Sequence, residues 1–377
     1  MKVRIPLARP EITDADRMAV LAVLNTEQLS TGPQVEKFER ALSAYVGVKF
    51  AVAVNSGTSA LHLAVQTLRL PQGSEVILPS FAFAAPLNVV LQCGLRPVFV
   101  DVDQDTLNTT PEQIEAAITP RTSAIVAIHN FGRPVDMPAV CTIAKRQNLR
   151  VIEDACEALG SEVGGRKAGT FGDVSVLAFY PNKQITTGEG GVMLTNNLES
   201  ANHARRLRNQ GRDPALDWLQ QIDAGYSYRL SDINCALGVS QLERIESVIA
   251  RRLWLAELYN EKLESIPGIC RPNLLSPLGR ISWFCYVIQL REPFGRKHRD
   301  ELCEKLLARG IGAGRYFAPL HRQPILAGAG KESALPVTDF VADRVIALPF
   351  FNQMEEADVC EVADALKASV ASLRRNI

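Results

Sequence analysis

The sequence has no excess of charge of either sign. It contains 41 Lys and Arg residues against 41 Asp and Glu residues, and its formal net charge at pH 7 is zero. Nucleic acids and anionic membranes attract proteins that carry a field of positive charge, so we expect neither as a partner. The expected ligands are small molecules or proteins.

Long apolar runs and paired cysteines are also missing. Charged residues interrupt the first 20 positions, and no later stretch of 18 residues is apolar throughout, so we expect a cytoplasmic protein without a signal peptide or membrane span. The eight cysteines form no C-x-x-C motif and have no histidine at metal-binding spacing, which favours free thiols and no metal site. They are Cys93, Cys141, Cys156, Cys235, Cys270, Cys285, Cys303 and Cys360.

Short segments rich in Val, Ile and Phe, alternating with helical stretches, predict an α/β fold with a mostly parallel sheet. The first five segments are separated by stretches long enough for crossover helices, whereas the last two follow glycine-rich loops, which favours a hairpin or an irregular connection. The expected strands are 50–55, 75–78, 97–102, 123–129, 150–153, 173–179 and 191–195.

The C-terminal part of the chain predicts a second, smaller domain. Apolar residues recur at helical spacing over 232–266, and Pro267 and Gly268 end the pattern, so we expect one long helix that links two domains. A strand at 282–290 and helices at 299–309 and 358–374 then predict a small α+β domain. Because 377 residues exceed what one core usually serves, we expect a large domain over residues 1–248 and a small one over 249–377.

The segment NSGTSAL (55–61) joins an apolar strand to a helix and is typical of a phosphate site. Ser56 and Thr58 carry hydroxyl groups, Gly57 allows close approach of the backbone, and the first turn of a helix presents free N–H groups. An ordinary N-cap has the same residues, so this motif alone leaves both interpretations open.

A second motif, IEDACEALGS (152–161), places Glu153 and Asp154 at the end of an expected strand, where open α/β sheets bind ligands. Side chains alternate along a strand, so only one of the two faces the site. A buried carboxylate there needs a cation, and a protonated pyridine nitrogen is one candidate. A metal or a helix N-terminus would suit the carboxylate as well.

The third motif is Lys183, which lies between a strand exit and the glycine-rich run TTGEGG (186–191). A lysine in a loop is normally solvated. The glycines indicate that the backbone passes close to a bulky group, and an enclosed lysine is what imine formation with a carbonyl requires.

A phosphate cradle, a late-strand aspartate and a loop lysine are, in this order, the anchors of pyridoxal phosphate (PLP). Here the chain resembles the DegT/DnrJ/EryC1/StrS family of fold-type I sugar aminotransferases over nearly its whole length. The resemblance implies a large α/β/α domain with a mostly parallel sheet and a smaller C-terminal α+β domain. It is carried by TGPQVEKFE (31–39), NSGTSAL (55–61), PVFVDVD (97–103), IEDACEALGS (152–161), FYPNKQITTGEGG (179–191), YRLSDINCALGVSQL (228–242) and YFAPLH (316–321).

The resemblance also implies roles for single residues. Lys183 would carry the imine and move protons, Asp154 would pair with the pyridine nitrogen, and Glu157 would lie near the ring hydroxyl or the substrate. Ser56, Gly57 and Thr58 would hold the phosphate, Phe83 would stack on the ring, and Ser227 and Arg229 would reach the site from the second chain of a homodimer. Tyr316 and His321 are candidates to approach the sugar. Phe83 and His321 would also suit simple packing roles.

Two positions depart from the family pattern, and both concern the phosphate. The family commonly has Ser where this chain has Ala178, and Asn where it has Ser227. We therefore expect weaker or rearranged phosphate contacts and intact chemistry at Lys183 and Asp154.

The activity implied is transfer of an amino group from glutamate to a nucleotide-linked keto sugar, with a 4-keto-6-deoxyhexose favoured by the TTGEGG segment. Alternatives are a cyclitol ketone or a 3-keto sugar as acceptor, or a non-catalytic regulator, which would not need the intact anchors. Relatives that dehydrate their sugar carry His in place of the lysine, so Lys183 disfavours that reaction.

Overall fold

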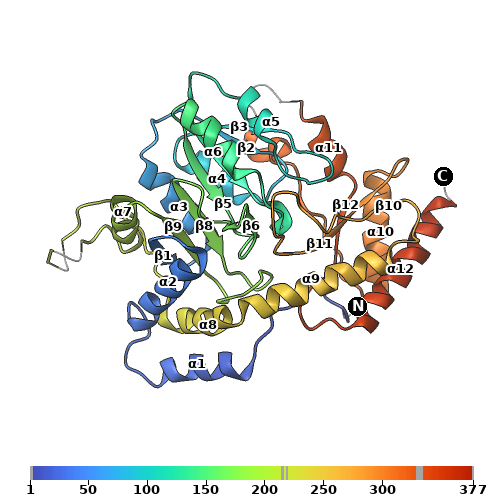
Figure 1. The fold of residues 1–377 in the computed structure, drawn as a ribbon, viewed down its shortest axis with the longest axis horizontal. Helices are drawn as coiled ribbons and strands as arrows, with labels where there is room; N and C mark the ends of the chain where they lie inside the picture. Colours follow the sequence, from blue (N-terminus) through green and yellow to red (C-terminus); the bar gives the residue numbers. More distant parts are fainter. Residues whose placement is uncertain (1–2, 214–215, 218–219, 328–333, 376–377) are drawn as a thin grey trace.

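The structure is a computed structural model that describes residues 3–213, 216–217, 220–327 and 334–375 (Figure 1). A seven-stranded sheet has the order β1-β9-β8-β5-β4-β2-β3. Six strands are mutually parallel, and β9 runs antiparallel to both of its neighbours. The strands are β1 (Phe50–Val54), β2 (Glu75–Pro79), β3 (Arg96–Val100), β4 (Thr122–Ile128), β5 (Arg150–Asp154), β8 (Val174–Ala178) and β9 (Gly191–Thr195).

The seven predicted strands are confirmed to within two residues at each end, and so is the hairpin between β8 and β9. The parallel strands other than the edge strand β3 are buried along most of their length because helices cover both faces of the sheet. Helices α3 (Gly57–Leu68), α4 (Ala85–Gln92) and α7 (Leu198–Arg208) cover one face. The other face is covered by α2 (Pro33–Val46), α5 (Pro111–Ala116), α6 (Met137–Arg146) and α8 (Asp232–Glu243).

The single helix expected over 232–266 is wrong, because the chain forms α8 and α9 (Ile245–Lys262) with a break at Arg244. Arg244 has φ −112° and ψ 14°. Its guanidinium is held by the carboxylates of Glu11 and Asp16, at 3.1 and 3.0 Å, near α1 (Asp14–Leu24). Apolar spacing continues across the break, so the hydrophobic pattern gave no sign of it. Helix α9 runs from the large sheet to the C-terminal part (Figure 1).

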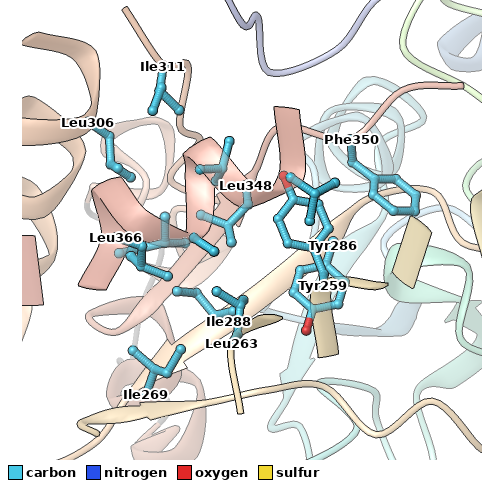
Figure 2. Packing of buried hydrophobic residues seen from close by; sticks show 14 of the residues in the cluster. Tyr259, Leu263, Ile269, Tyr286, Ile288, Leu306, Ile311, Leu348, Phe350 and Leu366 are labelled. Atoms are coloured by element: carbon cyan, nitrogen blue, oxygen red, sulfur yellow. The ribbon is translucent and has the colours of Figure 1, made fainter. Parts of the chain in front are cut away.

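The C-terminal part is built on a three-stranded antiparallel sheet, β10 (Ile269–Cys270), β11 (Tyr286–Leu290) and β12 (Val345–Leu348). Helices α10 (Arg296–Ala308), α11 (Pro336–Ala342) and α12 (Glu356–Arg374) accompany it, with short 3₁₀ turns η2 (Leu320–Arg322) and η3 (Pro324–Leu326). Figure 2 shows its core, in which Tyr259 of α9 stacks on Tyr286. The predicted α+β character is confirmed.

Two smaller features complete the fold. The predicted strand 282–290 begins only at Tyr286. Ser282 and Phe284 contact the lysine loop, and the carbonyl groups of Trp283 and Phe284 accept hydrogen bonds from Arg252 of α9. A two-stranded hairpin, β6 (Glu162–Val163) and β7 (Arg166–Lys167), and the turn η1 (Asn130–Gly132) border the same region. Ile5, near the N-terminus, packs in the C-terminal core.

Within the described residues, no helix has the length and apolar character needed to cross a membrane. The same part of the chain contains no cluster of three or more His, Cys, Asp or Glu side chains that could hold a metal ion.

Candidate active site

A cavity of about 280 Å³ lies where β5, β8 and the N-terminus of α3 meet. Side chains from the C-terminal part close it from the other side. Eight of the residues predicted from the sequence line this cavity, although they come from five separate segments. They are Ser56, Gly57, Thr58, Phe83, Asp154, Glu157, Lys183 and Tyr316.

The N-terminus of α3 forms one wall. Ser56 is the N-cap, and its hydroxyl oxygen accepts a hydrogen bond from Ser59 N at 3.0 Å. A Cβ atom at Gly57 would lie 2.7 Å from Cβ of Ala178, so only glycine lets the helix start so close to the end of β8. The N–H groups of the first turn have no partner inside the helix, and this end of the helix favours an anion.

Lys183 enters the cavity from the loop after β8. Its side chain is 13 % exposed, and Nζ lies 3.5 Å from Oε1 of Glu157 and 4.1 Å from the centre of the Phe284 ring. The following residue anchors the loop, because Gln184 Nε2 donates to the carbonyl oxygens of Glu157 (2.7 Å) and Ser282 (3.1 Å). Lys183 is thus held between a carboxylate and an aromatic face in a nearly closed space.

Asp154 faces this cavity from the end of β5, whereas Glu153 faces the opposite side of the sheet, as strand alternation predicts. Oδ1 of Asp154 accepts a hydrogen bond from Cys156 N at 3.0 Å. Burial raises the pKa of Asp154, and the hydrogen bonds from Cys156 and the charge of Lys183 only partly offset that effect. A buried carboxylate in this state would be stabilised by a further cation.

Glu157 is held by an unusual turn. Its Oε2 accepts a hydrogen bond from Phe131 N at 2.8 Å, and Phe131 has φ 59° and ψ 19°, a left-handed conformation that is rare for a bulky residue. Burial raises the pKa of Glu157, while Lys183 lowers it to a smaller extent. The Phe131 turn therefore orients Glu157 so that its other oxygen, Oε1, faces Lys183.

Aromatic side chains form the rest of the wall. Phe83 is 65 % exposed, so an open face of its ring borders the cavity. Tyr316 stacks on Phe317, and burial raises the pKa of the Tyr316 hydroxyl to about 12. Both residues can present apolar surface to a flat or cyclic ligand.

Three predicted residues do not line the cavity. Ser227 and Arg229 lie on the segment beside the end of β1, where Arg229 Nη1 donates to Asn209 Oδ1 at 3.0 Å. His321 is held elsewhere: Nδ1 lies 2.6 Å from Ser80 Oγ, and Nε2 lies 3.2 Å from Asp339 Oδ1. Within one chain, His321 therefore joins the end of β2 to α11 and does not approach the lysine.

Sequence reasoning missed several cavity residues, namely Asn130, Tyr180, Asn182, Glu189 and Phe284. Tyr180, Asn182 and Glu189 lie in the motif around Lys183, so their position next to the lysine was a usable signal. Asn130 and Phe284 had no such signal, because turn η1 and the segment before β11 reach the cavity only in the folded chain.

The residues fit PLP. The N-terminus of α3 suits its phosphate, the buried and incompletely paired carboxylate of Asp154 suits a protonated ring nitrogen, and Lys183 suits an aldehyde. Of the described residues that line the cavity, Lys183 is the sole cation, against the carboxylates of Asp154, Glu157 and Glu189. A ligand with several negative charges would need additional positive groups.

Comparison with known proteins supports this interpretation. The model of the DegT/DnrJ/EryC1/StrS aminotransferase family matches residues 10–367. GDP-perosamine synthase of Caulobacter vibrioides is 37 % identical, over 96 % of this chain and 97 % of that protein.

Two solved structures have the same fold. DesV of S. venezuelae, in complex with a ketimine intermediate, is 32 % identical with a TM-score of 0.87, over 96 % of this chain and 99 % of that one. DesI, in the presence of its TDP-sugar product, is 30 % identical with a TM-score of 0.90, over 100 % of this chain and 97 % of that one.

Proposed function

The chain belongs to the DegT/DnrJ/EryC1/StrS aminotransferase family, and from this premise we propose that it binds PLP through Lys183 and transfers an amino group from glutamate to a nucleotide-linked keto sugar. That it is an enzyme, an aminotransferase acting on a sugar, follows from the family. The cofactor, the donor, the acceptor and the roles of single residues are the proposal.

The observation that supports it best is the convergence of three chemically distinct anchors in one cavity. Lys183, Asp154 and the N-terminus of α3 come from separate segments and line the same space. When bound, PLP supplies an aldehyde and an electron-withdrawing ring. Asp154 would keep the ring nitrogen protonated. The amine of Lys183 would form the covalent bond to the cofactor and then carry protons. Glu157, whose Oε1 lies 3.5 Å from Nζ of Lys183, would exchange a proton with that amine.

The acceptor class comes from the relatives. The Caulobacter protein is named for a GDP-linked sugar, and DesI was solved in the presence of a TDP-linked sugar that is its product. We propose a nucleotide-linked 4-keto-6-deoxyhexose for this chain. The apolar side chains of Phe83, Leu61, Pro86 and Phe317 line the cavity and would suit a sugar that lacks the 6-hydroxyl group.

The charges of the cavity support a homodimer with shared sites. A cofactor phosphate, glutamate and a sugar diphosphate are all anions, but the described lining offers one cation and three carboxylates. We propose that a second copy of the chain supplies further positive charge. Arg229, with Ser227 beside it, is the residue that we propose a second copy would contribute.

Borohydride reduction tests the cofactor bond. Protein purified with PLP should be yellow, and after reduction a single peptide containing Lys183 should carry the mass of the reduced cofactor. Lys183→Ala should remove the label and lower transamination by at least ~10²-fold, because both the covalent bond and the proton carrier are lost. Label on another lysine, or none in the wild-type protein, would refute the assignment.

A second experiment tests donor and acceptor. Glutamate alone should bleach the yellow protein to the amine form of the cofactor, and nucleotide-linked 4-keto-6-deoxyhexoses should restore the colour. A non-catalytic regulator would leave the spectrum unchanged, and an enzyme for a cyclitol ketone or a 3-keto sugar would recover only with those compounds.

A further inference from the structure

Helix α9 carries an arginine whose side chain is buried behind the cavity wall. Arg252 is 3 % exposed and does not line the cavity. The neighbouring Arg251 points elsewhere: its guanidinium donates to the carbonyl oxygens of Asn352 and Met354 and lies over the Trp254 ring. The two adjacent arginines therefore have separate acceptors.

The hydrogen bonds of Arg252 end on the backbone of the two segments that meet at the lysine. Nη1 donates to the carbonyl oxygens of Phe284 (2.9 Å) and Trp283 (3.3 Å), and Nη2 donates over 3.4 Å to the carbonyl oxygen of Lys183. The Phe284 ring lies against the ammonium group of Lys183. One planar guanidinium therefore holds the backbone of both Lys183 and Phe284. The compact ammonium group of a lysine is less suited to bind two separate segments at once.

The burial of this cation needs an explanation. No ion pair with an Asp or Glu of the described residues involves Arg252, and burial lowers its pKa to about 10, so it stays protonated at neutral pH. Its Nε atom is also buried without an acceptor in the described part of the chain. Three hydrogen bonds to backbone carbonyl groups, and the Phe350 ring 5.5 Å from the guanidinium carbon, offset part of the cost of burying this charge. All three bonds end on the segments that meet at the lysine.

We propose that Arg252 is a positioning residue, which fixes the backbone of Lys183 and Phe284 so that the lysine amine meets the cofactor aldehyde in a reactive orientation. The inference rests on the proposed role of Lys183 as the covalent anchor. It assigns no direct contact between Arg252 and cofactor or substrate.

The test measures how fast Lys183 captures PLP in apoprotein. PLP is added, samples are reduced with borohydride at successive times, and the Lys183 peptide is quantified by mass spectrometry. Arg252→Met keeps a long side chain but removes every N–H donor of the guanidinium. This variant should slow PLP capture by ~10- to 100-fold. Arg252→Lys, which keeps the charge, should recover part of the rate, and Arg251→Met should remain within about twofold of the wild type.

A measurement without cofactor distinguishes a misplaced Lys183 amine from one that reagents cannot reach. Reductive methylation of Lys183 in the same apoproteins should be unchanged or faster in Arg252→Met, because a loosened loop exposes the amine. Slow PLP capture with methylation at or above the wild-type rate supports the proposal. Capture at the wild-type rate, or methylation that falls in parallel with capture, overturns it.

Folding is checked by circular dichroism and thermal unfolding. If Arg252→Met does not fold, the test uses Arg252→Lys instead. PLP capture at the wild-type rate in Arg252→Lys would then overturn the proposal. Failure of the proposed function looks different, because wild-type protein itself would then carry no label on Lys183.

Discussion

Two adjacent carboxylates at the end of β5 are both buried, but they accept hydrogen bonds from very different numbers of donors. Glu153 is 0 % exposed and Asp154 is 6 % exposed. Glu153 accepts hydrogen bonds from backbone N–H groups of Gly169, Phe171 and Gly172, from the Ser175 hydroxyl and from His129. The one residue that donates hydrogen bonds to Asp154 in the described structure is Cys156.

The pKa directions follow this difference. The hydrogen bonds from His129 and the backbone outweigh the burial of Glu153 and lower its pKa, whereas burial dominates at Asp154 and raises its pKa. His129 Nδ1 accepts from Val135 N at 2.9 Å, so Nε2 is the donor to Glu153. On one side of the strand Glu153 belongs to a complete hydrogen-bond network, whereas on the other side Asp154 faces the cavity with hydrogen bonds from one residue.

The largest expected effect is on catalysis, from Asp154→Asn. Loss of the carboxylate removes the group proposed to keep the ring nitrogen charged, so turnover should fall by ~10²- to 10³-fold. The apoprotein should be as stable as the wild type or more stable, because an incompletely paired buried charge is removed. Steady-state transamination with glutamate, together with denaturant unfolding, checks both parts.

Glu157→Gln is a matched control for this variant, since it removes a different carboxylate from the same cavity. It should keep more activity than Asp154→Asn. If the Asp154 variant turned over at the wild-type rate, the contrast between the two sides of β5 would have no functional meaning.

The sequence predicted this contrast in part. Strand alternation indicated that Glu153 and Asp154 face opposite sides, and the sequence motifs around Lys183 and Asp154 identified these two residues. The partners of Glu153 could not be found, because they depend on backbone N–H groups of a loop at residues 169–172. Arg252 was also out of reach, since its acceptors are carbonyl groups that carry no sequence signal.

The second effect is on stability, from Glu153→Gln. The amide can accept fewer hydrogen bonds and places a donor against the N–H groups that now face the carboxylate. The free energy of unfolding should fall by about 2–4 kcal/mol, and the folded fraction should still bind PLP. Denaturant titration monitored by circular dichroism measures the loss. A drop in cofactor binding without a drop in stability would contradict the structural role.

The two carboxylates should make stability depend on pH in opposite directions. The lowered pKa of Glu153 means that its contribution is present above the ordinary pKa of Glu and is lost as the pH falls through the lower folded value. The raised pKa of Asp154 has the opposite sign: its penalty is absent at acid pH and grows as the pH rises through the folded value.

Unfolding of the three apoproteins should therefore be measured from well below the ordinary pKa values of Asp (3.8) and Glu (4.5) up to neutral pH. The Glu153 difference should develop below pH 4.5 and the Asp154 difference above pH 3.8. Relative to wild type, Glu153→Gln should lose stability as the pH rises, and Asp154→Asn should gain it. Parallel curves for both variants would show that the two carboxylates are in equivalent environments.

The smallest expected effect concerns Ala178, which also lines the ligand side of the sheet, at the end of β8. Its Cβ faces Gly57 at the start of α3, so Ala178→Ser would place a hydroxyl beside the N–H groups proposed to hold the phosphate. One added hydrogen bond to a charged group is worth about 1.5 kcal/mol, so PLP should bind roughly tenfold more tightly, measured by equilibrium dialysis of the apoprotein.

Ser175→Ala, on the Glu153 side of the same strand, should leave this affinity unchanged, because its hydroxyl belongs to the complete hydrogen-bond network of Glu153. Equal affinities in Ala178→Ser and wild type would mean that the phosphate lies away from β8.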